Sequence, residues 1–368
     1  MKKHLAALAV PLLFSIGMAA SPVLADNGHG KGLFVDRDVD TFAVLPNGVK
    51  QPEGITANPA NGDIYVATFH FSNPNKLLRY NRHGQLLAQL DFGGAPLLGL
   101  GFDHGMVYIL NFGASQLQRV PAAFNSATKP EPVATFLPGI GAPAPRRVDN
   151  PDATPEHPSF DTITFGSNSF PAPNAMEFDS KGNLYVSDSF QGAIYLIEDV
   201  RTCKTPCTAK TLVHDSLLAT AGFPPFGANG LAFNRYESLL FIANTGDDRV
   251  LALDMHTNLV SVFSESLNGA DGLVFDKRSG LLWVCTNQAD EVVALNDKGR
   301  VVAKLGELRG IKRNGTPDGL LFPASPVIVG DEIFVTNLAI PLGSSADEPE
   351  ADVTRWTISR MRLPHGKD

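Results

Sequence analysis

The chain of 368 residues lacks several features that would point to a particular class of protein. It has no cluster of Lys and Arg, and its formal net charge is -8, so we expect neither nucleic acid nor an anionic membrane surface as a partner. No apolar run after residue 25 is long enough to span a bilayer. A Gly-x-Ser-x-Gly motif is absent as well, which disfavours a serine hydrolase.

Cysteine is scarce, with three residues in the whole chain. Cys203 and Cys207 are close in sequence, and in an oxidising compartment they could close a small disulfide loop. Cys285 lies in an apolar run, which is typical of a buried, unreactive thiol and not of a nucleophile. The sequence therefore predicts one disulfide and one free thiol.

The first 25 residues have the pattern of a secretory signal peptide. A short basic start is followed by an apolar stretch from Leu5 to Ala20, which is too short to span a bilayer comfortably. Small residues come next, and we expect cleavage after Ala25. The mature chain, 26–368, is then predicted to be periplasmic or secreted, with a retained membrane anchor as the alternative.

Short apolar runs with a central aromatic residue recur six times along the chain. A turn rich in Asn, Asp or Gly precedes each run, and another apolar run precedes that turn, so the pattern predicts six β-hairpins. A second hairpin often follows, which makes four antiparallel strands per unit. We therefore expect an all-β fold, in which 26–368 form a single six-bladed β-propeller around a central channel. The six runs are Ile64-Tyr65-Val66, Val107-Tyr108-Ile109, Leu184-Tyr185-Val186, Leu240-Phe241-Ile242, Leu282-Trp283-Val284 and Ile333-Phe334-Val335.

Two segments depart from this regular spacing. The segment 41–45 could add a strand to the last blade beside residues 354–363, and this pairing would remove the free edges of an open ring. The stretch from about 125 to 169 is rich in proline and polar residues and is long for a connection in a compact domain. We expect a loop insertion there, either a lid over one mouth of the channel or a flexible excursion.

When the six units are aligned on their aromatic residues, they share one position where each innermost strand begins. The innermost strands of a propeller line its channel, so six equivalent positions form a ring there. If two carboxylates of this ring were about 5 Å apart at an effective dielectric constant near 20, they would repel each other by about 3 kcal/mol. A divalent cation would cancel both charges, and the amide oxygens would complete the ligand set. The ring residues are Glu53, Leu98, Asn174, Asn229, Asp271 and Ser325.

The donor set of this ring predicts the kind of metal. Oxygen ligands alone favour calcium or magnesium, and no His or Cys occupies a ring position, which argues against zinc. We predict Ca²⁺ bound by Glu53, Asn174, Asn229 and Asp271, with Mg²⁺, Mn²⁺ or Zn²⁺ as alternatives. A single Asn or Asp before glycine more often stabilises a turn, so the prediction depends on the shared register of all four.

A second set of six polar residues lies three positions after the aromatic residues. We interpret these side chains mainly as partners for backbone groups between blades. A supporting role behind the metal ligands remains open for Asp188 and Asn244. The set is Thr68, Asn111, Asp188, Asn244, Thr286 and Asn337.

Four short motifs at blade spacing resemble the regucalcin/gluconolactonase family, with paraoxonases and diisopropylfluorophosphatases as more distant relatives. The motifs are Pro-Glu-Gly-Ile at 52–55, Pro-Asn-Ala-Met-Glu-Phe-Asp at 173–179, Ala-Asn-Gly-Leu-Ala-Phe-Asn at 228–234 and Ala-Asp-Gly-Leu-Val-Phe-Asp at 270–276. The resemblance covers nearly the whole mature chain. It implies one catalytic calcium or similar ion held by the four ring residues, and hydrolysis of lactones, esters or organophosphates.

One position departs from this family. Its sugar-lactone members carry an arginine two residues before the asparagine of the third blade, where this chain has Ala172. A sugar-acid lactone is therefore a doubtful substrate. Apolar Leu98 in the ring and several nearby phenylalanines favour a more hydrophobic substrate; they are Phe170, Phe223, Phe226 and Phe322.

The leading functional prediction is an exported, calcium-dependent hydrolase of small lactones or related esters. The metal would polarise the carbonyl group, and Asp271 would take the proton of the attacking water. His70 is the alternative base, because it follows the second strand of its blade; a surface histidine in a loop is the simpler interpretation. The alternative function is a non-catalytic binding propeller with a structural calcium. The sequence leaves the oligomeric state open.

Overall fold

The computed structural model describes residues 32–168, 170–343 and 347–364. The predicted signal peptide, 1–25, lies outside the described residues. The described residues from Leu33 onwards form one compact unit. The helical segments in the described ranges have three or four residues, and none of them could cross a membrane. They are η1 (Phe112–Ala114), η2 (Ser216–Leu218), η3 (Asn287–Ala289) and η4 (Pro349–Asp352).

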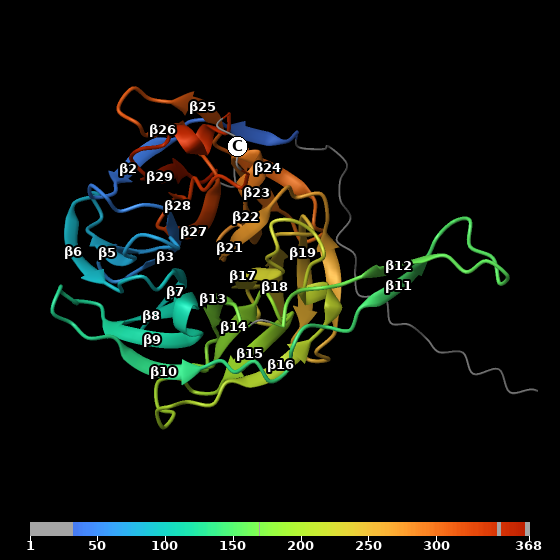
Figure 1. Cartoon of the computed structure of the whole chain (residues 1–368). Helices are drawn as coiled ribbons and strands as arrows, with labels where there is room; N and C mark the ends of the chain where they lie inside the picture. The colour runs from blue at the N-terminus through green and yellow to red at the C-terminus, as the bar shows by residue number, and fades with distance from the viewer. Residues whose placement is uncertain (1–31, 169, 344–346, 365–368) are drawn as a thin grey trace, which may run out of the picture. The chain divides into compact units, whose positions relative to one another are not determined.

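Six antiparallel sheets of four strands surround a common axis, and they confirm the predicted six-bladed propeller (Figure 1). Blade 1 contains β3 (Pro52–Ala57), β4 (Ile64–Thr68), β5 (Lys76–Tyr80) and β6 (Leu86–Asp91). Blade 2 contains β7 (Leu97–Asp103), β8 (Met106–Asn111), β9 (Gln116–Pro121) and β10 (Glu131–Thr135). Blade 3 contains β13 (Pro173–Phe178), β14 (Leu184–Asp188), β15 (Ala193–Ile197) and β16 (Lys210–His214).

The other three blades follow the same order from the axis outward. Blade 4 contains β17 (Ala228–Phe233), β18 (Leu239–Asn244), β19 (Arg249–Asp254) and β20 (Val260–Ser264). Blade 5 contains β21 (Ala270–Asp276), β22 (Leu281–Thr286), β23 (Glu291–Leu295) and β24 (Val301–Leu305), and β1 (Phe34–Asp36) adds a parallel fifth strand beside β24. Blade 6 contains β27 (Pro323–Val329), β28 (Glu332–Asn337), β29 (Thr357–Arg362) and β2 (Asp40–Val44).

The recurring aromatic residues join neighbouring blades. Tyr65 of blade 1 packs against Phe102 of blade 2, with ring centroids 5.9 Å apart. Three equivalent pairs follow around the propeller, with centroid distances of 5.1 to 6.3 Å: Tyr108 with Phe178, Tyr185 with Phe233, and Phe241 with Phe275. The second strand of each blade is almost fully buried, so the aromatic repeat of the sequence forms the apolar contacts between blades.

Strands β2 and β29 close the propeller as predicted. β2 pairs antiparallel with β29, with Asp40 opposite Arg360 and Val44 opposite Thr357. The N-terminal part of the described chain therefore supplies the outer strand of the last blade. This pairing leaves the ring without a gap between its first and last elements.

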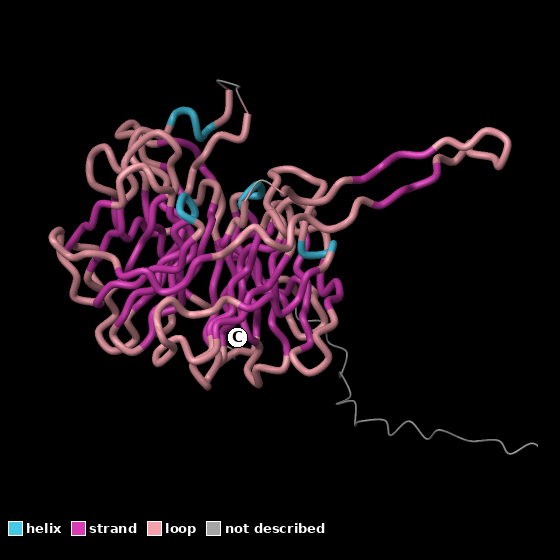
Figure 2. Tube along the Cα trace, turned by 60° about the horizontal axis from the view of Figure 1, so that its bottom comes forward, coloured by secondary structure: helices cyan, strands magenta, loops and turns pink. Residues whose placement is uncertain are grey.

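The stretch at 125–169 is partly regular structure and not a continuous loop. Residues 131–135 form β10, the outer strand of blade 2. Residues 146–163 contain a two-stranded hairpin, β11 (Arg146–Asp149) with β12 (Phe160–Ile163), which extends away from the blades (Figure 2). A smaller hairpin, β25 (Leu308–Ile311) with β26 (Pro317–Gly319), precedes blade 6.

The three cysteines are arranged as predicted. Cys203 and Cys207 form a disulfide in the turn between β15 and β16. Cys285 is fully buried in β22, and burial raises the pKa of its thiol well above the ordinary value. A buried, protonated thiol is a poor nucleophile, in agreement with a structural role.

Candidate metal centre

An irregular pairing at the start of each innermost strand forms the ring. The first residue of each strand pairs with the end of the second strand, and the next two residues bulge before regular pairing resumes. The first bulge residue is Glu53, Leu98, Asn174, Asn229 or Asp271 in blades 1 to 5, as the sequence predicts. These bulges place equivalent side chains at one end of the channel.

The prediction for blade 6 was wrong by one residue. Pro323 pairs with Asn337 at the start of β27, so the first bulge residue is Ala324 and not Ser325. The alignment failed because the connection between the first two strands is shorter in this blade. Ala324 lies ten positions before its aromatic residue, as Leu98 does. The ring thus contains two carboxylates, two amides and two apolar side chains.

Close packing between blades explains why small residues follow the ring positions. A Cβ atom on Gly54 would lie 2.2 Å from the carbonyl oxygen of Leu98, and one on Gly230 would lie 2.3 Å from that of Asp271. Neighbouring innermost strands therefore approach too closely for larger side chains. The Asn229-Gly230 and Asp271-Gly272 pairs lie in strands and are packing features of the ring, not turns.

Three of the ring side chains are held by hydrogen bonds. Asn174 Nδ2 donates to Ser189 Oγ at 2.8 Å. Asn229 Nδ2 donates to Thr245 Oγ1 at 3.0 Å and to Asp271 Oδ1 at 2.6 Å. Asn287 Nδ2 donates to Asp271 Oδ2 at 3.0 Å. Because the NH₂ groups of both ring asparagines are occupied by these acceptors, their Oδ1 atoms are the ends left for a ligand.

Sequence reasoning missed the side chains that orient the ring. They lie four positions after each aromatic residue, directly beyond the second polar set, and this spacing was visible in the sequence. We call these six residues the collar. In blades 3 to 5 the collar is polar and contacts the ring residue of its own blade, whereas in blades 6, 1 and 2 it is apolar. Its members are Phe69, Phe112, Ser189, Thr245, Asn287 and Leu338.

Two oxygen atoms at the ring are buried without a partner. Glu53 is 5 % exposed and Asn174 is 2 % exposed. Within the part of the chain that the structure describes, no group hydrogen-bonds Glu53 Oε2 or Asn174 Oδ1. An unpaired buried oxygen costs about 1–3 kcal/mol, and more when it is charged. Such atoms fit a cation that accepts their lone pairs.

The two carboxylates at the ring have perturbed protonation. Burial, followed by the charge of Asp271, raises the pKa of Glu53 well above its ordinary range. Burial raises the pKa of Asp271 to about 7, although the amides of Asn287 and Asn229 oppose the shift. A divalent cation would oppose both shifts, because a nearby positive charge favours the ionised form of each buried carboxyl group. The donor set, two carboxylates with two amide oxygens, therefore fits calcium or magnesium.

No group of three or more His, Cys, Asp and Glu residues suited to a metal occurs in the described ranges. The ring holds two carboxylates and completes its oxygen set with amides. All four predicted ligands, Glu53, Asn174, Asn229 and Asp271, line one pocket of about 80 Å³ on the collar side of the ring. The structure thus brings the predicted ligands together around a space that a ligand can enter.

The second polar set binds backbone groups, as the simpler interpretation predicted. Asp188 Oδ1 accepts hydrogen bonds from the backbone N–H groups of Ala172, Phe190 and Gln191. Asn244 Nδ2 donates to the carbonyl oxygens of Leu217 and Ala219. Neither side chain lines the pocket at the ring.

The geometry at His70 favours a structural role. Its Nδ1 accepts hydrogen bonds from the backbone N–H groups of Ser72 and Asn73, at 2.9 and 2.8 Å. Its Nε2 lies 3.2 Å from Asn73 Nδ2. Burial and the nearby charge of Lys50 lower the pKa of the His70 imidazole. The imidazole thus stabilises its own turn, and it does not line the pocket at the metal ligands.

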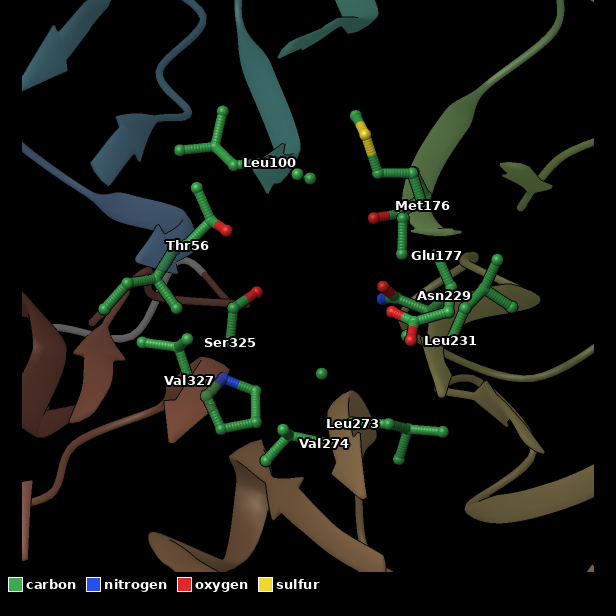
Figure 3. A pocket seen from close by; sticks show the side chains of 18 of the residues that line it. Thr56, Leu100, Met176, Glu177, Asn229, Leu231, Leu273, Val274, Ser325 and Val327 are labelled. Carbon is green, nitrogen blue, oxygen red and sulfur yellow. The ribbon is translucent and has the colours of Figure 1, made fainter. Parts of the chain in front are cut away.

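The channel on the other side of the ring forms a second cavity, of about 280 Å³. Glu53, Asn174 and Asn229 line both cavities, so the ring separates them. Figure 3 shows the labelled side chains around the open centre of the channel, with Glu177 and Asn229 on the same side. Burial raises the pKa of Glu177 to about 8, opposed by the charge of Lys277.

Glu177 makes the stability of the protein depend on pH. The folded state keeps its proton up to about pH 8, whereas the unfolded chain loses it near the ordinary value of 4.5. The contribution of Glu177 to the free energy of unfolding is therefore fully present below pH 4.5, and it is lost as the pH rises towards 8. We expect Glu177→Gln to change the free energy of unfolding in a more stabilising direction at pH 8.5 than at pH 5, as measured by urea unfolding. Glu198→Gln, a change on an exposed side chain of the same blade, is the control, and parallel pH profiles of wild type and Glu177→Gln would contradict the prediction.

The fold is a six-bladed propeller with four oxygen-bearing side chains at one end of its channel, and several solved structures are similar to the chain. A calcium-binding protein, regucalcin, from Agrobacterium tumefaciens has a TM-score of 0.59 at 15 % identity, covering 89 % of this chain and 94 % of that one. A gluconolactonase from Xanthomonas campestris has a TM-score of 0.54 at 13 % identity, covering 87 % and 89 %. Virginiamycin B lyase from Staphylococcus aureus has a TM-score of 0.52 at 12 % identity, covering 89 % and 99 %.

These similarities confirm, at the level of the fold, the resemblance to regucalcin and gluconolactonase. Proteins with different activities share the fold at comparable scores, so the fold alone does not identify the reaction. No protein-family model matches the sequence, and no curated protein matches it. The activity must therefore be inferred from the side chains of the ring.

Proposed function

We propose that the mature chain is an exported hydrolase of lactones or related esters that binds a divalent cation, calcium before magnesium, at the ring. One observation carries the proposal. Two buried oxygens without a hydrogen-bond partner among the described residues, Glu53 Oε2 and Asn174 Oδ1, lie with Asn229 and Asp271 around a single pocket. A purely structural polar cluster would satisfy such atoms internally.

The four ring residues would hold the cation, which would polarise a substrate carbonyl in the pocket. Asp271 is the proposed base. Each of its oxygens accepts one amide N–H, which leaves one lone pair on each: one would bind the cation and the other would take the proton of a water molecule. The amides of Asn229 and Asn287 keep the carboxylate in one orientation. Glu53 has no equivalent partner and is assigned the role of a ligand.

Export is supported by the N-terminal sequence pattern and by the disulfide between Cys203 and Cys207. Disulfides persist in oxidising compartments and are rare in reducing ones. A periplasmic or secreted protein would meet calcium at higher concentrations than a cytosolic one, which suits a site with only two carboxylates.

The experiment is a hydrolysis assay of the purified mature protein with aliphatic lactones, aryl esters and a phosphotriester, each with and without calcium. Calcium-dependent hydrolysis of lactones or esters is the expected result. If calcium binds but none of these compounds reacts, the enzymatic proposal is wrong. A binding propeller with a structural cation is then the better description.

A further inference from the structure

Ring and collar residues divide the pocket on the collar side of the ring into a polar half and an apolar half, and Pro224 and Phe226, in the connection between blades 3 and 4, add apolar surface beside the polar half. Blades 3, 4 and 5 supply the hydrogen-bonded pairs of the ring and the polar collar. Blades 6, 1 and 2 supply Glu53 and otherwise only apolar side chains. Of these apolar side chains, Leu98 of the ring and Phe69 and Leu338 of the collar line the pocket together with Phe322, and all four are at least 93 % buried.

The apolar half continues from the ring towards solvent. Ile340 and Leu342, which follow β28, are half-buried and line the same pocket as Phe322 and Leu338. Outside this pocket, Phe170, which is 37 % exposed, packs against Phe112 with ring centroids 5.4 Å apart. Apolar side chains thus line the pocket from the proposed reacting centre to Ile340 and Leu342, which reach solvent.

The charges around this pocket are of one sign. Among the described residues, no Lys, Arg or His lines it, whereas Glu53 and Asp271 do. An anionic substituent would find no cationic side chain in the apolar half. A substituent with several hydroxyl groups would lose its hydrogen bonds to water there without replacing them. A neutral hydrocarbon group gains from the same surface.

We infer that the substrate is a neutral lactone or ester with an alkyl or aryl substituent. The carbonyl group lies at the polar half of the ring, and the substituent lies against Leu338, Ile340 and Leu342. The chemical step in this inference rests on the proposed function, whereas binding of the apolar group does not. Sugar lactones and carboxylate-bearing lactones are excluded as good substrates.

Two series of compounds test the inference on the calcium-loaded protein. The first is γ-lactones with side chains from methyl to hexyl, compared with gluconolactone, and the measurement is kcat/KM. Each added methylene that enters the apolar half should raise kcat/KM about fourfold until the chain reaches the rim. The second series is 2-alkylcyclopentanones, which cannot be hydrolysed, with affinity measured by calorimetry. Their affinity should rise by the same factor.

A variant localises the effect. Ile340→Thr combined with Leu342→Asn should reduce the factor by which each methylene raises kcat/KM and ketone affinity towards one. The reason is that polar side chains then replace the apolar wall. Leu137→Asn is the control, since Leu137 is 70 % exposed and lies outside the pocket. It should leave both series unchanged. The wild-type comparison with gluconolactone stands even if the double variant fails to fold.

The outcomes separate the two proposals. Hydrolysis of the γ-lactones with no dependence on chain length, or of gluconolactone as fast as the hexyl compound, would overturn this inference and leave the hydrolase function standing. No hydrolysis, together with ketone affinity that rises with chain length in wild type and not in the double variant, would reject the hydrolase and support the apolar site. If neither kcat/KM nor ketone affinity rises with chain length, the inference is wrong.

Discussion

Asp271→Asn should lower kcat for lactones by roughly 10²–10⁴-fold at saturating calcium, whereas Glu53→Gln should recover a substantial part of its rate. Each change removes one negative charge from the ring and keeps an oxygen donor, so both variants should bind calcium more weakly by a similar factor. Only the first change also removes the proposed base. The rates of the two variants at saturating metal therefore separate binding from chemistry.

Calcium affinity must be measured directly, by calorimetry, on both variants. Asp271→Asn also replaces one of the two acceptor oxygens by an NH₂ donor, which then faces the amide donor of Asn229 or Asn287, so its folding should be checked by its unfolding midpoint. Asp276→Asn, the same change at the other end of β21, is the matched control and should keep full activity. Equal recovery of both ring variants would remove Asp271 from the role of base.

Chelation of the metal should abolish activity and lower the stability of the folded protein. At free calcium about 100 times its dissociation constant, binding stabilises the native state by about 2.7 kcal/mol. For a domain of this size, that difference corresponds to a melting temperature lower by about 5 °C after chelation. The physical cause is the return of two buried, uncompensated carboxylates, Glu53 and Asp271, to the ring.

Elemental analysis of the untreated protein and a calcium titration after chelation complete this experiment. Recovery of both activity and melting temperature should follow one binding curve. Glu53→Gln should need more calcium for the same recovery. An unchanged melting temperature after thorough chelation, with no metal found in the untreated protein, would contradict the ring as a metal centre.

Much of this fold could be predicted because the repeat is local. The turn and the aromatic run of each blade are adjacent in sequence, and the aromatic residues meet phenylalanines of the next blade. The ring residues of blades 1 to 5 could be predicted for the same reason. The register failed at blade 6, since the bulge opposite Asn337 decides which residue takes the ring position; this pairing assigns Ala324, whereas Ser325 lines the channel cavity (Figure 3).

The sequence by itself determined the number of blades, the closure through 41–45 and the oxygen donors of the ring, since turns, aromatic spacing and residue chemistry are properties of the chain. Only the tertiary structure decided which side-chain atoms are free to bind a metal or a proton. The NH₂ groups of Asn174 and Asn229 donate hydrogen bonds to Ser189 and Thr245, which leaves their side-chain oxygens for a metal, and two backbone N–H groups donate to Nδ1 of His70. Hydrogen bonds depend on distances between side chains that only the folded backbone sets, and so does the division of the pocket into a polar and an apolar half.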